Sequence, residues 1–378
     1  MNKKHGKLAK IFPLVSMMLV GAAFGYLAAK YGLSGSGKIS TSTAIMLLFL
    51  FVPIFFFVIA LHEMGHAIAG LWVNFDFRMY VVGPFMWNKE SGNWKFSWNK
   101  NVNTAGGLVL CLPTTTENLE KRFCVFALGG PTASLLLAGL CFLIARILPY
   151  EMSSATIAEQ TLKSSLYIIS LLSFVIFIFT ALPMHTGGFS TDGARALRLL
   201  KGGDASRFEV LLLKTITLSS SGMRPRLLNI DELNEAQFLA NKIDAPYSVY
   251  LHSYFHQAAW DKGETAEAEK HLLNYVEDAE KIPAGIRNSV WLDAAFFYAF
   301  AEKNLPEAEK YWSQFKPTAM IPKAQVLATE AAMAFGKGDY SLAQAKAMMA
   351  QQELPNMLDK GLAMALGEKL ISLQQTHE

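Results

Sequence analysis

Four stretches in the first half of the chain contain no charged residue over a length that suits a membrane-spanning helix. Each is about 19–23 residues long, and a helix needs about 20 apolar residues to cross the hydrocarbon core of a bilayer. The stretches are Ile11–Ala29, Ile39–Leu61, Phe123–Ala145 and Ser164–Met184. Because helices of soluble proteins are seldom uniformly apolar over this length, the pattern predicts about four transmembrane helices.

The first stretch has a second interpretation. It follows Lys3, Lys4, Lys7 and Lys10, and a positively charged start before an apolar run is also typical of a secretory signal peptide. No convincing small-residue cleavage site precedes Lys30. We therefore favour a retained helix, while cleavage of this segment stays open.

The cations that flank the stretches predict their direction. Cytoplasmic loops of membrane proteins carry an excess of lysine and arginine. The lysines before Ile11 place the N-terminus in the cytoplasm, and alternation then puts loop 74–122 and the chain after residue 193 on the same side. Both segments are rich in lysine and arginine. The expected protein spans the cell membrane several times, with both termini in the cytoplasm.

Composition supports a membrane half joined to a soluble half. Charged residues are 17% of the chain, and they are about half as frequent in residues 1–200 as in residues 201–378. This excludes a fully soluble single-core protein and a disordered one. The net charge of +3 is too small to indicate nucleic-acid binding. The three cysteines lack the paired spacing of a disulfide framework or a cysteine metal site.

The second stretch ends in the sequence HEMGH, which spans His62–His66. Residues four apart share one face of a helix, so both histidines can bind one cation. This HExxH pattern is typical of zinc hydrolases, in which zinc activates a water molecule and the glutamate, here Glu63, accepts its proton. Each ionisable group in a membrane helix costs about 2.5–3.5 kcal/mol of insertion free energy. One divalent cation would interact favourably with His62, Glu63 and His66 together. The alternative is a helix that simply emerges at the cytoplasmic face.

A zinc hydrolase needs a third protein ligand, and the segment after the fourth stretch offers two candidates. Pro183 and the pair Gly187-Gly188 break the helix there, and Asp192 follows the break. We favour Asp192 as the third ligand of one zinc ion per chain, with His185 as the competing ligand. Asp192 could instead serve only as the cap of a helix that starts near Ala194.

Together these motifs resemble the site-2 protease family of intramembrane zinc metalloproteases, which have a three-helix catalytic core. The resemblance covers roughly residues 40–200. It implies that His62, His66 and Asp192 bind zinc and that Glu63 is the general base. The motifs that carry it are His62–His66, Gly130-Pro131, Leu182-Pro183 and Asp192-Gly193.

The sequence also departs from the family pattern. Thr180 and Ala181 stand where an asparagine often precedes the Leu-Pro pair, and the gap from Pro183 to Asp192 is longer than usual. Ser134 stands where an asparagine is common. These departures indicate a divergent subgroup of the bacterial type and leave the substrate-binding residues unknown.

Two features outside the motifs suggest binding surfaces. The apolar run Met79–Phe85, the turn-rich segment Asn88–Asn93 and the alternating aromatic and polar residues Trp94–Trp98 together predict a membrane-associated β-hairpin with its aromatics on one face. Those aromatics could anchor the protein at the membrane interface. Alternatively, an edge strand could pair with an extended substrate segment.

Residues 205–378 predict a helical domain in which three segments look alike. Each contains an interhelix turn, a helix start and an alanine, and the alanines lie about 40 and 35 residues apart, near the period of tetratricopeptide repeats. The segments are Asp261–Ala268, Glu302–Ala308 and Gly336–Ala343. Such arrays usually bind peptides or proteins, so we expect a protein partner here. Plain packing of helix pairs without a ligand is the alternative.

The sequence therefore predicts an all-α, polytopic membrane protein in three parts. These are an N-terminal cytoplasmic tail with the first transmembrane helix (1–38), an intramembrane metalloprotease core (39–200) and a cytoplasmic tetratricopeptide-like domain (201–378). We expect a zinc metalloendopeptidase that cleaves transmembrane or signal-peptide-derived protein substrates near the cytoplasmic side. The alternatives are a catalytically inactive adaptor that recruits partners through the helical tail, and a metal transporter. A transporter would need polar residues along several helices, which the apolar stretches lack.

Overall fold

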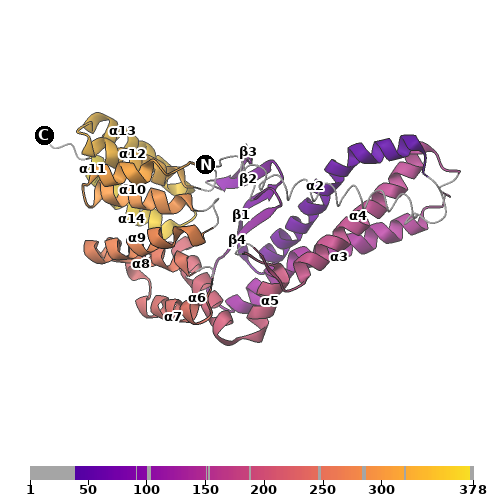
Figure 1. The fold of residues 1–378 in the computed structure, drawn as a ribbon, viewed down its shortest axis with the longest axis horizontal. Coiled ribbons are helices and arrows are strands. Elements are labelled where there is room, and N and C mark those ends of the chain that lie inside the picture. The colour runs from indigo at the N-terminus through magenta and orange to yellow at the C-terminus, as the bar shows by residue number, and fades with distance from the viewer. Residues whose placement is uncertain are drawn as a thin grey trace, which may run out of the picture. The chain divides into compact units, whose positions relative to one another are not determined.

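A computed structural model describes residues 39–90, 92–99, 104–149, 151, 154–186, 189–245, 248–282, 287–318 and 321–374. The predicted first helix, Ile11–Ala29, lies outside these residues. The described chain is mostly helical, with a small antiparallel sheet (Figure 1). It divides into two compact units, Met1–Gly65 with Gly130–Phe179 and His66–Gly129 with Thr180–Glu378. The boundaries between the units fall within the three long helices.

Three long apolar helices account for the second, third and fourth predicted stretches. They are α2 (Thr41–Trp72), α3 (Leu119–Ile147) and α4 (Ile157–Ala181). Each is long and apolar enough to cross a membrane. Large apolar side chains such as Phe49 and Leu136 are 77% and 68% exposed, which is expected of surfaces that face lipid. The helices indicate a membrane protein.

A few hydrogen bonds tie these helices together within the first unit. The Thr43 hydroxyl at the start of α2 donates to Gln160 Oε1 on α4 at 2.8 Å, and the Ser40 backbone N–H donates to the same oxygen at 3.0 Å. Farther along, the Ser170 hydroxyl on α4 donates to the Ala138 carbonyl on α3 at 2.8 Å. Such bonds fix the helix register in an apolar medium, where apolar contacts alone give little direction.

The predicted β-hairpin is part of a larger sheet. Strands β1 (Phe75–Val82), β2 (Phe85–Glu90), β3 (Asn93–Trp98) and β4 (Leu108–Pro113) form an antiparallel sheet in the order β3-β2-β1-β4. The all-α description therefore needs correction, since four strands form where one hairpin was expected. The first predicted strand is split by a turn at Gly83, whose φ of 55° lies in the left-handed region that glycine adopts without strain.

The aromatic face of the hairpin is confirmed. Cross-strand neighbours Phe85 and Trp98 have ring centroids 5.7 Å apart, and Trp87 and Phe96 are 5.5 Å apart. Edge strand β3 is almost wholly exposed, including Trp98 at 59%. The sheet thus presents an exposed row of rings beside an unpaired strand edge among the described residues.

Helices fill the rest of the second unit, and three pairs of them form helical hairpins. The predicted look-alike segments are the turns within these hairpins, and Ala268, Ala308 and Ala343 are all fully buried. The predicted boundary at residue 200 falls at the end of α5. The helices are α5 (Asp192–Lys201), α6 (Gly203–Ser220), α7 (Ile230–Lys242), α8 (Val249–Lys262), α9 (Thr265–Glu277), α10 (Asn288–Phe300), α11 (Leu305–Trp312), α12 (Lys323–Gly336), α13 (Tyr340–Glu353) and α14 (Lys360–Gln374), with short 3-10 turns at Pro225–Leu227, Asp278–Lys281 and Leu354–Asn356.

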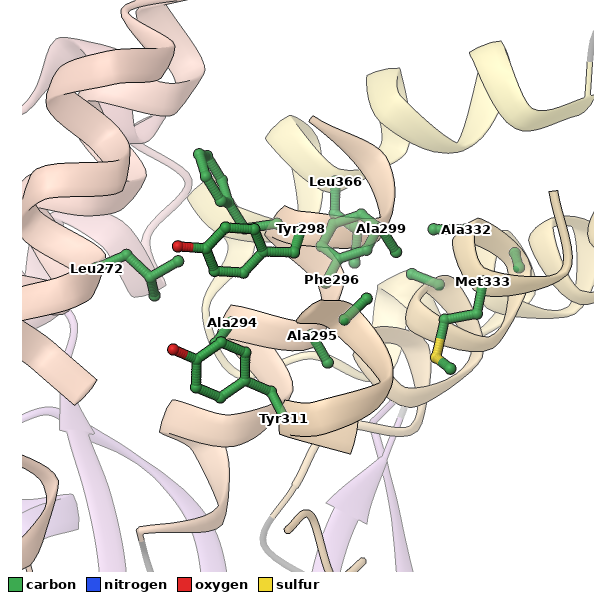
Figure 2. Close-up of a cluster of buried hydrophobic side chains, with 14 of the residues drawn as sticks. Leu272, Ala294, Ala295, Phe296, Tyr298, Ala299, Tyr311, Ala332, Met333 and Leu366 are labelled. Atoms are coloured by element: carbon green, nitrogen blue, oxygen red, sulfur yellow. The ribbon is translucent and has the colours of Figure 1, made fainter. Parts of the chain in front are cut away.

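Alanines at the helix contacts let these hairpins pack closely. Figure 2 shows Ala294 and Ala295 of α10 among larger side chains, with the rings of Tyr298 and Tyr311 near each other. Those two rings stack at a centroid distance of 5.6 Å and join α10 to α11. Burial of such a continuous apolar core is the main stabilising term of a helical domain. A tetratricopeptide-like character remains a prediction.

The last helix packs back on the first helices of this domain. The Ser219 hydroxyl at the end of α6 donates to the Asp359 carboxylate just before α14, at 2.7 Å. Gly361 lies so close to the Met223 carbonyl that a Cβ atom would be 1.9 Å from that oxygen. Only glycine fits there, so α14 is held in a fixed position against α6.

Candidate metal centre

Helix α2 carries the whole HExxH segment in one continuous turn. His62 and His66 stand four positions apart and Glu63 lies between them. All three are buried, with exposures of 6%, 7% and 9%. Because the predicted apolar stretch ends at Leu61 but the helix runs on to Trp72, the polar triplet sits inside the helix. The alternative of a helix that simply emerges into water is therefore not supported.

Each histidine ring is held through its Nδ1 atom. His66 Nδ1 lies 2.9 Å from the Phe126 carbonyl oxygen on α3, and His62 Nδ1 lies 2.9 Å from the Ser134 hydroxyl on the same helix. A carbonyl oxygen can only accept, so His66 Nδ1 carries the proton and the neutral ring has a lone pair on Nε2. Contacts of this kind are the usual way in which metal-binding histidines are oriented.

The break after α4 brings Asp192 to the same place. Thr191, not Asp192, caps α5: its hydroxyl accepts from the Ala194 N–H and donates to the Leu182 carbonyl at 2.6 Å. Gly193 packs so tightly on the end of α4 that a Cβ atom would lie 1.8 Å from the Ala181 carbonyl oxygen. Asp192 is thus the first residue of α5, and the cap-only role considered for it belongs to its neighbour.

The three predicted ligands converge. Asp192 Oδ2 lies 3.3 Å from His66 Nε2, and one ligand atom from each of His62, His66 and Asp192 lies within 4.8 Å of the others. Ligand atoms around a tetrahedral zinc ion are about 3.4 Å apart, given bonds of about 2.0–2.1 Å. Two imidazoles and a carboxylate are also the donor types that zinc takes in hydrolases. The residues present therefore fit a zinc ion.

Two parts of the site were not found from the sequence. The Phe126 carbonyl that orients His66 has no side-chain signal, because every residue carries a carbonyl. Ser134 was noticed only as a departure from a family pattern, and its hydrogen bond to His62 gives that position a role. The side chain of His185, the competing ligand, lies outside the described part of the chain. Its backbone forms a two-residue strand that pairs with Phe189-Ser190.

The membrane core is the part of the chain that resembles a known protein family. A family model described as Peptidase family M50, the site-2 protease family, matches residues 50–150. This match supports the predicted relationship to site-2 proteases. No curated protein and no solved structure matches the chain. The matched segment contains His62, Glu63, His66 and Ser134, and it ends before Asp192.

The match and the helices together suggest a membrane metalloprotease. Family M50 proteins are zinc metalloproteases, so the cofactor that the family implies agrees with the donor set of the site. The matched segment is less than half of the chain, and it does not reach the helical domain. What this chain cleaves, and what its last 178 residues bind, is therefore a matter of proposal.

Proposed function

We propose that this protein is an intramembrane zinc endopeptidase, with His62, His66 and Asp192 as the zinc ligands and Glu63 as the general base. The observation that carries the proposal is the convergence of three ligand atoms from two segments more than a hundred residues apart. Each histidine ring is already held through its other nitrogen. A site prepared in this way lowers the cost of ordering ligands when a cation binds.

The roles of the residues follow from their places. A zinc ion held here would supply a Lewis acid that makes water a nucleophile near neutral pH. Glu63, one residue after His62, would accept a proton of that water at a carboxylate oxygen and deliver it to the amide nitrogen that leaves. Burial of Glu63 limits bulk water around its carboxylate. Ser134 and the Phe126 carbonyl keep the two imidazole rings in place.

The site-bearing ends of the helices face the cytoplasm in this proposal. HEMGH lies towards the C-terminal end of α2, and Asp192 follows the C-terminal end of α4. The segments after these ends contain many lysines and arginines, which is typical of cytoplasmic segments. They are Arg78, Lys89, Lys95, Lys121, Arg122, Arg195, Arg198 and Lys201. The protein would therefore be a multi-pass protein of the cell membrane that cleaves transmembrane or signal-peptide-derived substrates near its cytoplasmic side.

An extended substrate would suit the exposed sheet edge. A helical peptide bond is shielded by its own hydrogen bonds, so a substrate helix must unwind before it is cut. Strand β3 offers backbone groups on an edge, and its neighbouring rings can rest at the membrane interface. We propose that the rings anchor the sheet at the membrane interface and that strand β3 pairs with an extended substrate segment. The two uses are compatible, because the rings project from the strand faces while backbone pairing uses the edge.

Metal analysis and a cleavage assay on the purified full-length protein test this function. We expect about one zinc per chain, cleavage of a single-span reporter in detergent or nanodiscs, loss of cleavage with a chelator and recovery with added zinc. A protein that folds, binds no zinc and leaves every reporter intact would be the inactive adaptor instead.

A further inference from the structure

The helical domain contains a cavity that the proposed protease chemistry does not use. It is bounded by α8, α10, α12 and α14, with Pro225 at one side. Aromatic rings of Trp260 and Phe296 and the amides of Gln257 and Gln325 line it. Two charged side chains, Asp293 and Lys369, also line it. A mixed apolar and polar lining of this kind is typical of sites that bind small groups with a fixed orientation.

The carboxylate of Asp293 is the unusual member of this lining. Among the residues that the structure describes, it makes no hydrogen bond and no ion pair, although α10 holds it between the buried residues Leu292 and Ala294. Burial raises the pKa of Asp293 to about 7. A half-buried carboxylate without an ion-pair partner gains from a cation that enters the cavity.

The other charges near the cavity are already balanced. Lys369 Nζ lies 4.4 Å from the centroid of the Trp260 ring. Next to it, Arg224 binds Asp261 and Glu368, so this group holds two cations and two anions. Asp293 has no counterpart of this kind. Counted with this neighbouring group, the charges around the cavity have an excess of one acidic group, and the aromatic walls also favour cations.

We propose that this cavity binds an arginine or lysine side chain of an extended peptide, with the cationic group at Asp293 and the methylene stem against the paired rings of Trp260 and Phe296. A metal ion is a poorer occupant, because the cavity offers only one carboxylate and hard cations take several oxygen ligands. An anionic group is also poorer, because it would meet Asp293, and Lys369 is already engaged by Trp260.

This inference rests on the proposed function and names what the protease recognises. If the helical domain lies in the cytoplasm, it meets the cytoplasmic flanks of membrane-spanning substrates. Those flanks are rich in lysine and arginine for the same reason that orients the helices. The cavity would then capture the basic flank of a substrate while the metal centre acts on its membrane segment.

Peptide binding to the full-length protein in detergent tests the inference. The probes are a fluorescein-labelled octapeptide with two arginines and a matched peptide with citrulline, the neutral isostere, at both places. By fluorescence anisotropy, we expect the arginine peptide to bind wild-type protein at least about tenfold more tightly. Asp293→Asn should weaken arginine-peptide binding about tenfold and abolish the difference between the peptides.

The control variant is Glu302→Gln, which removes the same charge from an exposed position in the same helical hairpin. It should bind like wild type. Equal binding of the two peptides by wild-type protein would overturn the inference without any variant. Equal weakening by Asp293→Asn and Glu302→Gln would also overturn it, because general surface charge would then explain the binding.

Zinc content and cleavage of a reporter without basic flanks, measured on the same preparations, separate the two proposals. Asp293→Asn should leave both unchanged. If wild-type protein cleaves that reporter but does not discriminate between the peptides, the inference fails alone. If it discriminates but neither binds zinc nor cleaves, the proposed function fails and peptide capture stands.

Discussion

Two partly buried clusters of ionisable side chains in this protein differ in how their charges are satisfied. In the helical domain, Arg224 donates to Asp261 at 3.3 Å and to Glu368 at 2.9 Å. Every charge of that cluster faces an opposite charge. In the membrane core, two imidazole nitrogens and a carboxylate oxygen converge within 4.8 Å, and they are acceptors once the rings are neutral.

The difference separates a structural cluster from a binding site. Arg224 completes its cluster from within the chain, so nothing further is needed to hold the helices together. The cluster of His62, His66 and Asp192 brings lone pairs together, and such an arrangement is stable only with a proton or a cation at its centre. The following predictions are meant to break or sharpen this contrast, beginning with the largest effect.

Removing a metal ligand should have the largest effect. Asp192→Asn keeps the shape of the side chain but replaces the anionic ligand with a weak neutral one. We expect zinc affinity to fall by about a hundredfold or more, with unchanged helicity. Asp204→Asn, in the first turn of α6 at a half-exposed aspartate that pairs with Lys242, is the control and should retain zinc. Wild-type zinc content in Asp192→Asn would point to another third ligand.

Breaking the structural cluster should lower stability and leave zinc alone. Arg224→Met keeps the length of the side chain but strands the carboxylate of Asp261, whose side chain is only 3% exposed. We expect about 3–5 kcal/mol less stability for the helical domain, seen as a lower Tm by circular dichroism. Glu368→Gln should shift Tm much less, since Glu368 is 60% exposed. A zinc loss in Arg224→Met would contradict the separation of the two clusters.

Removing a hydrogen bond behind a ligand should have an intermediate effect. Ser134→Ala deletes the hydroxyl that holds His62 Nδ1 and changes little else at a position that is 1% exposed. We expect zinc affinity to fall about 10–100-fold in a metal-competition titration. The control is Ser173→Ala, another buried serine of the membrane helices, whose hydroxyl has no hydrogen-bond partner among the described residues. If both serine variants bind zinc like wild type, His62 is oriented by other contacts.

The smallest effect should come from Asp293 and depend on pH. Its pKa is raised from 3.8 to about 7, so the folded state favours the protonated form. The stabilising contribution of Asp293 is therefore fully present below about pH 4 and is lost as pH rises from about 4 to 7. Above about pH 7 this contribution no longer changes. Asp293→Asn should remove that loss and stabilise the domain by about 1–2 kcal/mol at pH 8, because the cavity still admits water.

The titration of Asp293 is read from the difference between wild-type and Asp293→Asn proteins, because a neighbouring histidine affects stability over the same pH range. Of the titratable side chains near Asp293, His256 on α8 has a pKa lowered by burial to about 4, burial also lowers the pKa of Lys369 on α14, and burial raises the pKa of Tyr275 on α9. Helix α12 contributes the uncharged Gln325 and Thr329 to the cavity. Equal pH dependence of Tm in wild-type and Asp293→Asn proteins would contradict the assignment.

Much of the membrane core was predictable because a helix that crosses lipid needs about 20 consecutive apolar residues. Apolar stretches of spanning length predicted three of the helices, although α2 runs on to Trp72, beyond the end of its stretch at Leu61. The first stretch lies outside the described residues. Strand β4 was missed, because Leu108–Pro113 is a short apolar run without a period of two. The turn at Gly83 was missed because the run Met79–Phe85 was expected to form one continuous strand of the hairpin.

The candidate site was predictable where side-chain type carries the chemistry. His62, Glu63 and His66 share a motif, and Asp192 stands out as an acidic residue after a membrane helix. The Phe126 carbonyl and the cap at Thr191 depend on backbone geometry that no residue type reveals. The cavity at Asp293 depends on four helices meeting, and the sequence shows Asp293 only as one acidic residue in an apolar helix.

The central claim is that a zinc ion at His62, His66 and Asp192 works with Glu63 as the base. Purified wild-type and Glu63→Gln proteins should be compared for zinc content and for cleavage of a single-span reporter, with Glu117→Gln as a control at an exposed glutamate. We predict equal zinc in all three and a loss of cleavage of about a hundredfold or more in Glu63→Gln alone. Wild-type cleavage by Glu63→Gln protein with a full zinc complement would contradict the account.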